Sequence, residues 1–172
     1  IQQVPAPPAN DECTNAILIT TQPYGATCTA SISANTTGST QSTFNPSCTG
    51  TDNNDDTWYS FTAQTQSILL RYSNAVQTIT GSFGGLGYAL YNGNCPTNAT
   101  TVSCSSGVGF SNSYQIINGL TIGNTYLLRL FSDGINNYVS FDFCVQDVPA
   151  LPVNDECTNA IPVPLTLPGT LC

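Results

Sequence analysis

Residues 138–145 read Tyr-Val-Ser-Phe-Asp-Phe-Cys-Val and carry the strongest structural signal in the chain. Val139, Phe141, Phe143 and Val145 alternate with serine, aspartate and cysteine. A strand with one buried face has this period of two. The stretch therefore predicts a half-buried β-strand.

Shorter runs of the same kind precede this strand. They are rich in β-branched and aromatic residues and are separated by glycine and asparagine turns. These runs lie at residues 17–20, 26–34, 57–62, 68–73, 88–91, 114–117 and 125–131. About nine short strands with almost no helical period predict an all-β fold, a jelly-roll-like β-sandwich. Trp58 is expected in the core on one face of its strand, with Tyr59 and Phe61 on the other.

The chain contains its own repeat just beyond residue 145. Residues 154–161 read Asn-Asp-Glu-Cys-Thr-Asn-Ala-Ile, the same eight letters as residues 10–17. The offset between the two cysteines is 157 − 13 = 144 residues. A fixed period of this kind indicates a repeat architecture. We therefore expect the chain to be a window of a longer tandem array, or a processed subunit of a repeating assembly.

The repeat divides the chain into four parts. We assign residues 1–9 to a proline-rich linker, 10–146 to the sandwich repeat, 147–153 to a second linker and 154–172 to the start of the next repeat. Prolines at this density favour extended, semi-rigid polyproline II. Asn10 or Asp11 is expected to cap a short helical turn that runs to Ala16. The residues predicted to form the joint between repeats are Pro5, Pro8, Asn10, Asp11, Glu12, Pro149 and Pro152.

Composition excludes several classes of partner and activity. The chain has 2 Lys and Arg against 10 Asp and Glu, no His, and a net charge of −8. Such an acidic protein repels nucleic-acid phosphates and anionic membranes, and no apolar run is long enough to span a bilayer. Without histidine or lysine, the usual bases and activated nucleophiles are missing, so we expect no enzyme activity and no cofactor.

Both cations, Arg71 and Arg129, lie in apolar strands, where they should cover a sheet face and pair with a carboxylate or a carbonyl. The alternative is that one of them binds an acidic group on a neighbouring repeat.

The eight cysteines predict disulfides in an extracellular, oxidising location, because there is no CxxC spacing and no histidine. Cys13 and Cys28 are 28 − 13 = 15 residues apart, and Cys157 and Cys172 are 172 − 157 = 15 apart. We therefore expect one local bridge at the start of each repeat. For the other four, a hairpin bridge is expected within the pair Cys95 and Cys104, which leaves Cys48 with Cys144. Sequence alone allows three pairings of these four residues.

Several segments, taken in their order along the chain, resemble a known family. Residues 7–17, 56–61, 88–95 and 119–130 together look like the NDEC-type β-sandwich repeat of large secreted and cell-surface proteins of Bacteroidetes, which is similar to bacterial pre-peptidase C-terminal domains. The resemblance implies a jelly-roll-like sandwich, export to the cell surface, and use as a tandem stalk, adhesin or accessory module. It implies no reaction. Relatives often place aspartates after the second hairpin cysteine, where this chain reads Cys-Ser-Ser-Gly at residues 104–107.

Two kinds of surface site remain as predictions. Asp52, Asp55 and Asp56 surround two asparagines and could offer Ca²⁺ hard oxygen ligands, although such a cluster also suits an ordinary turn. Asn35 and Asn98 begin Asn-X-Thr sequons, which could carry glycans where the host has the machinery.

The sequence leads to two hypotheses of function. The first is a non-catalytic structural or adhesive tandem repeat of an extracellular stalk, adhesin or surface filament, whose partners are neighbouring copies of itself. The second is a carbohydrate- or surface-binding accessory module, in which pairs of tyrosines such as Tyr88 with Tyr91, or Tyr114 with Tyr138, stack on sugars.

Overall fold

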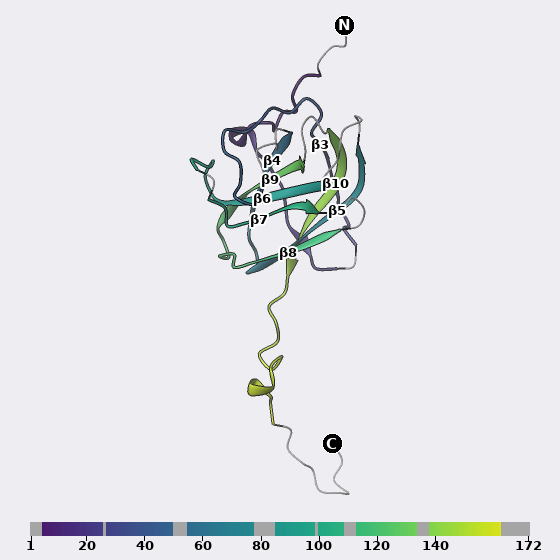
Figure 1. The fold of residues 1–172 in the computed structure, drawn as a ribbon. Coiled ribbons are helices and arrows are strands. Elements are labelled where there is room, and N and C mark those ends of the chain that lie inside the picture. The colour runs from purple at the N-terminus through teal and green to yellow at the C-terminus, as the bar shows by residue number, and fades with distance from the viewer. Residues whose placement is uncertain are drawn as a thin grey trace, which may run out of the picture.

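The structure is a computed structural model that describes residues 5–25, 27–49, 55–77, 85–98, 100–108, 113–133 and 138–162. Within these residues the fold is a sandwich of two β-sheets (Figure 1). The helical segments there are two three-residue 3-10 turns, which fall far short of a membrane-spanning helix. The predicted all-β sandwich is confirmed.

Ten strands build the two sheets of the described chain. Sheet A has the order β1-β4-β9-β6-β7, and sheet B has the order β2-β10-β5-β8, with β3 also paired to β10. The strands are β1 (Ile17–Leu18), β2 (Gln22–Pro23), β3 (Ile32–Asn35), β4 (Asp56–Thr62), β5 (Ser67–Gln77), β6 (Gly85–Asn92), β7 (Ser103–Val108), β8 (Tyr114–Asn118), β9 (Thr125–Asp133) and β10 (Val139–Val148). The 3-10 turns are η1 (Cys13–Asn15) and η2 (Cys157–Asn159).

The strand order is that of a jelly roll. Apart from the antiparallel neighbours β6 and β7, successive strands from β3 to β10 alternate between the sheets, which gives the orders β4-β9-β6-β7 and β3-β10-β5-β8. Strand β10 is central in sheet B: β5 pairs along its length, while β3 and then β2 pair with its other edge. The stretch with the strongest sequence signal is therefore the strand that holds sheet B together.

The main core lies between the sheets and follows the predicted alternation. In β10, Val139, Phe141, Phe143 and Val145 all belong to this core. Strand β5 contributes its inward residues at positions 68, 70 and 72, and Tyr59 of β4 packs edge-on against Phe143 with ring centroids 4.6 Å apart. Burial of aromatic and aliphatic side chains on both inner faces is what holds a sandwich together.

A second apolar cluster covers the outer face of sheet A. It consists of Trp58, Ala89, Tyr91, Leu127 and Phe131, with Cys13, Ala16, Cys95 and Cys104 packed against it. The prediction that Trp58 points away from Tyr59 and Phe61, as a buried residue, is confirmed: it is 1% exposed. A Cβ at Gly87 would lie 2.2 Å from the Phe131 ring, so only glycine lets this ring lie flat on β6.

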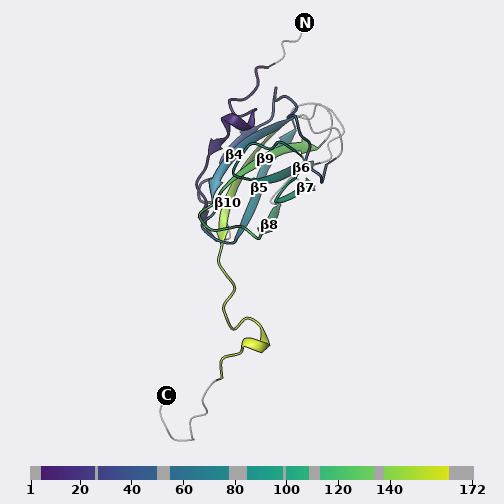
Figure 2. The ribbon, with the colours of Figure 1, turned by 90° about the vertical axis from the view of Figure 1, so that its left-hand side faces the viewer.

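Most predicted strands are present, and two were missed. No sequence pattern indicates β2, which is only two residues long, or β7, whose residues are mostly serine and glycine. The two ends of the described chain leave the sandwich at opposite poles (Figures 1 and 2). Residues beyond β10 extend away from the domain and carry η2 with no sandwich around it.

Candidate functional site

The first copy of the repeated octapeptide is bound to the outer face of sheet A. Asn10 is buried, and its side-chain amide donates to the carbonyl oxygen of Trp58 at 2.9 Å. The Trp58 amide in turn donates to the carbonyl oxygen of Asn10 at 2.8 Å. The pair of bonds fixes the position of Asn10 beside β4, so the motif begins as an added edge to the sheet.

The neighbouring Asp11 holds the loop that follows β3. Its two carboxylate oxygens accept hydrogen bonds from the amide and the hydroxyl of Thr40, each at 2.7 Å. Below this contact, a Cβ at Gly38 would lie 2.9 Å from the carbonyl oxygens of Pro5 and Ala6, and its φ of +81° also favours glycine. Residues 5–11 therefore cross directly over the turn at residues 36–40.

The predicted capping role of Asn10 and Asp11 is wrong. A short helical turn does form as η1, but Glu12 stands at its N-cap position and makes no side-chain cap bond. The two side chains are instead used for the tertiary contacts with Trp58 and Thr40. A turn of three residues has few unpaired amides to satisfy, so long-range bonds win over a local cap.

A buried ion pair lies under the motif. Arg129 of β9 donates from Nε to Asp56 Oδ2 at 2.8 Å, and both side chains are fully buried. Its Nη1 also donates to the carbonyl oxygen of Phe44 at 2.7 Å. Asp56 Oδ1 accepts from the indole of Trp58 at 3.0 Å and from Ser42 at 3.0 Å. Arg129 thus pairs with a carboxylate and a carbonyl, as the sequence predicted.

Burial raises the pKa of Asp56 from 3.8 to about 6, while the charge of Arg129 and the hydrogen bond from Ser42 act in the opposite direction. The carboxyl is therefore ionised at neutral pH. Because its charge is matched by Arg129, the pair is a means of fixing the loop at residues 42–44 to sheet A. It leaves no free acid or base for chemistry.

The predicted disulfide pairings are wrong. The structure joins Cys13 to Cys95, Cys28 to Cys144, and Cys48 to Cys104. Cys13 lies on the outer face of sheet A, whereas Cys28 lies on that of sheet B, so the sandwich separates them. The same separation excludes a bond from Cys48, which is bound to β7 of sheet A, to Cys144 of β10. Cys104 lies opposite Ala89 in β6, out of line with Cys95 beyond the end of that strand.

The second copy of the motif has the same local fold without a docking surface. The amide of Asp155 donates to Pro152 at 3.0 Å, as that of Asp11 does to Pro8 at 3.1 Å, and η2 repeats η1. All of residues 154–160 are exposed, and Cys157 has no disulfide partner among the residues that the structure describes. Its predicted partner, Cys172, lies outside the described residues.

The predicted joint residues thus fall into two groups. Pro5 and Pro8 lead into the docked copy, in which Asn10 and Asp11 are buried and Glu12 is exposed. Pro149 and Pro152 lead into the undocked copy and are exposed.

The predicted calcium ligands are only partly described. Asp52 lies outside the described residues, Asp55 is buried, and both oxygens of Asp56 are engaged as given above. Among the described residues, no group of three or more histidine, cysteine, aspartate or glutamate side chains could hold a metal ion. A calcium site at this loop stays a prediction.

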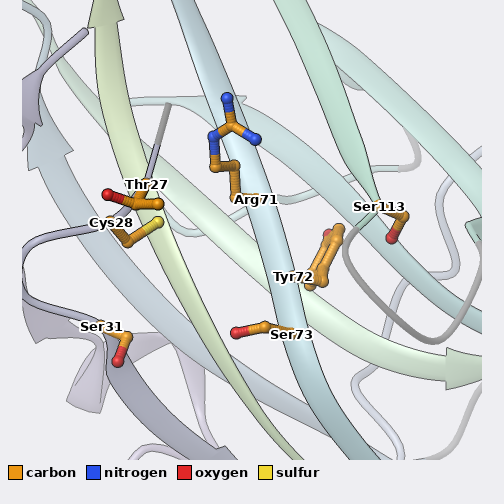
Figure 3. Close-up of a pocket in the computed structure, with 7 residues that line it drawn as sticks. All are labelled: Thr27, Cys28, Ser31, Arg71, Tyr72, Ser73 and Ser113. Carbon is orange, nitrogen blue, oxygen red and sulfur yellow. The ribbon is translucent and has the colours of Figure 1, made fainter. Parts of the chain in front are cut away.

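The other cation lies on the opposite outer face. Arg71 of β5 lines a pocket of about 440 Å³ together with Thr27, Cys28, Ser31, Tyr72, Ser73 and Ser113 (Figure 3). Its Nε donates to the side-chain oxygen of Gln146 at 2.9 Å, and its Nη2 donates to the carbonyl of Gly25 at 3.3 Å. Arg71 therefore donates to two carbonyl oxygens, whereas Arg129 donates to a carboxylate and a carbonyl.

The predicted tyrosine platforms are wrong. Tyr88 and Tyr91 are each 3% exposed and belong to the two cores. Tyr114 lies opposite Arg71 in the register of β5, whereas Tyr138 precedes Val139, which lies opposite Gln77. Arg71 and Gln77 are six residues apart along β5, a distance of about 20 Å, so the two tyrosines cannot form one platform. Of the four tyrosines in these two pairs, only Tyr114 is exposed, at 56%.

Both predicted sequon asparagines are exposed at turns. The side-chain oxygen of Asn35 accepts from the amide of Thr37, and that of Asn98 accepts from the amide of Thr100, each at 2.9 Å. Glycosylation at Asn35 and Asn98 stays a prediction.

Sequence reasoning missed the loop residues that contact the motif and the buried ion pair. Thr40, Ser42 and Phe44 bind Asp11, Asp56 and Arg129, but they lie in a polar stretch without periodicity. The only available signal was the pair of unusual charges in apolar strands, Asp56 and Arg129, which must find partners when buried.

Comparison with known proteins gives one family. Residues 9–145 match the T9SS-associated family described as galactose binding domain-like. No curated protein and no solved structure matched the chain in the corresponding searches. The matched range begins at the docked motif and ends in β10, so it covers both sheets of the sandwich. The chain therefore belongs to this galactose-binding-domain-like, T9SS-associated family.

Proposed function

We propose that the chain is a repeat of a non-catalytic extracellular surface protein, in which sandwiches follow one another as a stalk, adhesin or filament. The observation that carries the proposal is that one octapeptide occurs twice, docked at residues 10–17 and undocked at 154–161. The docked copy owes its burial to a sandwich that follows it in sequence. The second copy has the same turn, and its residues are exposed beyond the sandwich that ends with β10. We infer that residues 154–161 serve as the docking segment of a following repeat.

The arrangement suits a chain that bears load. The entering segment is held by Asn10 to β4, by Asp11 to the loop at Thr40, and by the Cys13–Cys95 disulfide to the end of β6. The leaving segment continues from β10, the central strand of sheet B, at the opposite pole (Figure 2). Tension between the two linkers would therefore pass through both sheets.

Family membership supports the location and the class of this function. A T9SS-associated domain implies a secreted or cell-surface protein, and galactose-binding-like domains are generally binding modules. The sequence supports it too, because it holds no histidine or lysine, and Arg129 is used in the fold.

A fusion of two repeats tests the proposal. Because residues 154–161 equal residues 10–17, residues 1–153 can be followed directly by residues 10–172 with no foreign sequence at the junction. We expect the junction cysteine to form a disulfide with the second unit's copy of Cys95, which a non-reducing peptide digest with mass spectrometry detects. Small-angle scattering should show an elongated particle. A free junction thiol in a fusion whose two sandwiches are folded would contradict the proposal.

A second function is favoured by the family description and by one exposed aromatic residue. A carbohydrate- or surface-binding module needs accessible side chains that stack and hydrogen-bond, and Tyr114 lies exposed beside the half-buried Arg71. A glycan array tests this directly, and an array without any bound glycan would contradict it. The two functions are compatible, because docking uses sheet A and Arg71 lies on sheet B.

A further inference from the structure

We propose that the Arg71 pocket binds the carboxylate of an acidic sugar, a uronic or sialic acid residue of a glycan. The inference rests on the second proposed function and names its site and its ligand class. The starting observation is charge: of the two cations in a chain of net charge −8, Arg129 is buried with Asp56, whereas Arg71 borders a pocket. An anion that approaches this protein finds its favourable contact there.

The pocket is built on the outer face of sheet B. Arg71 and Ser73 of β5 form its floor, and Ser113 immediately precedes β8. Thr27 and Ser31 line the other side, on a segment that the Cys28–Cys144 disulfide ties to β10 (Figure 3). Regular strands and a disulfide thus fix its walls. A site on rigid elements loses little conformational entropy when a ligand binds.

The guanidinium of Arg71 is held in place with donors to spare. Gln146 and Gly25 accept from Nε and Nη2, and within the described residues Nη1 has no hydrogen-bond partner. The ring of Tyr114 lies against the guanidinium, with 5.6 Å between the ring centroid and the guanidinium carbon Cζ. A planar guanidinium fixed in this way presents adjacent N–H groups to a carboxylate, which binds such a fork with two parallel hydrogen bonds.

The lining favours the carboxylate of an acidic sugar over a simple carboxylate such as acetate. Thr27, Ser31, Ser73 and Ser113 bring hydroxyl groups around one positive charge, and no acidic residue is among the lining residues. In the sheet register Asp142 lies opposite Ser73, but its oxygens already accept bonds from Ser33 at 2.7 Å and Asn74 at 2.8 Å. Hydroxyl donors and acceptors match the hydroxyls of a pyranose ring. Tyr114 is not one of these lining residues, but its exposed ring lies next to Arg71 and can pack against the C–H groups of a sugar that extends from the pocket.

Size and charge narrow the ligand further. A volume of about 440 Å³ admits one sugar residue, whereas a longer glycan would extend out of the pocket. A single arginine matches one negative charge, as in a uronate. A phosphate dianion would leave excess negative charge on a protein that is already acidic.

Titration of the full chain with free monosaccharides tests the inference. We expect glucuronate and N-acetylneuraminate to bind at low ionic strength, with chemical-shift changes at the pocket residues in NMR spectra. Glucose and glucuronamide, which lack the charge, should bind at least about tenfold more weakly, because charge-assisted hydrogen bonds are lost. Arg71→Gln should weaken glucuronate binding by at least about tenfold, and Arg71→Lys should recover part of it. Acetate should bind more weakly than glucuronate.

Asn98→Asp is the matched control, because it also changes the net charge by one unit, at an exposed turn beyond β6. It should leave glucuronate binding unchanged, and thermal melts should show that each variant is folded. Equal binding of acetate and glucuronate, or undiminished binding by folded Arg71→Gln, would overturn the inference. A glycan array that finds only neutral glycans, retained by Arg71→Gln, would overturn it as well while the second proposed function stands.

Discussion

Arg129 and Asp56 form an ion pair whose side chains are both completely buried on the outer face of sheet A. The pair is covered by the loop at residues 42–44 and lies beside Trp58. The distance from the Trp58 ring centroid to the guanidinium carbon of Arg129 is 5.8 Å. Both charged groups are shielded from water, and their hydrogen bonds hold the loop against sheet A. Removing one partner would leave the other charged and unpaired in the interior, which costs far more than the pair contributes.

Asp56→Leu and Arg129→Met should therefore each destabilise the protein by about 3–5 kcal/mol, whereas the double variant Asp56→Leu/Arg129→Met should lose less than either single variant. Chemical denaturation at pH 7, with the disulfides oxidised, measures these free energies of unfolding. Because pH 7 is above the Asp56 pKa of about 6, the carboxyl group is charged in this measurement. If the two single losses simply added in the double variant, the pair would not act as a unit.

Local patterns in the sequence predicted the strands well because burial is decided residue by residue. The alternation at Val139, Phe141, Phe143 and Val145, and that of Trp58 against Tyr59, each report which face of a sheet a side chain occupies. The same reasoning could not find β7, since Ser103, Ser105 and Ser106 carry no apolar period.

Long-range pairings could not be predicted from spacing. The disulfides join residues 82, 116 and 56 positions apart, because the jelly roll places strands distant in sequence side by side. The equal spacing from Cys13 to Cys28 and from Cys157 to Cys172 reflects equivalence between repeats and says nothing about bonding within one. The same limit applies to the site: Arg71 was recognisable as an unusual cation in a strand, but Thr27 and Ser113 reach it only through the fold.

The pH dependence of stability should contain a contribution from Asp142. Hydrogen bonds from Asn74 and Ser33 hold the pKa of its carboxyl below the ordinary value of 3.8. A lowered pKa stabilises the folded state above pH 3.8, and this stabilisation is lost as the pH falls through the folded-state pKa. In thermal melts from pH 2 to 7, the melting midpoint of the wild type should lie above that of Asp142→Asn at neutral pH. The difference between the two midpoints should narrow below pH 3.8. A constant difference across this range would show that the charge of Asp142 plays no part.

Calcium should have little effect on stability. Asp56 Oδ2 already accepts a hydrogen bond from Arg129, and Oδ1 accepts from Ser42 and Trp58, so this predicted ligand is not free to coordinate an ion. Melting midpoints in EDTA and in millimolar calcium should agree. A higher midpoint in calcium that Asp52→Asn abolishes would instead support the calcium site predicted from the sequence.

Asn10 and Asn154 occupy the same position of one octapeptide, and the chain therefore carries its own control. Asn10 is buried and binds Trp58, so Asn10→Ala should leave the Trp58 carbonyl without its donor and cost about 1–3 kcal/mol. Asn154 is exposed, and Asn154→Ala should leave the free energy of unfolding within about 0.5 kcal/mol of wild type. Chemical denaturation of the two variants side by side measures the contrast. In the two-repeat fusion, Asn154→Ala should become as destabilising for the second sandwich as Asn10→Ala is for the first, because the motif then has a sheet to dock on. If it stays silent in the fusion, residues 154–161 are not a docking segment, and the tandem function loses its main support.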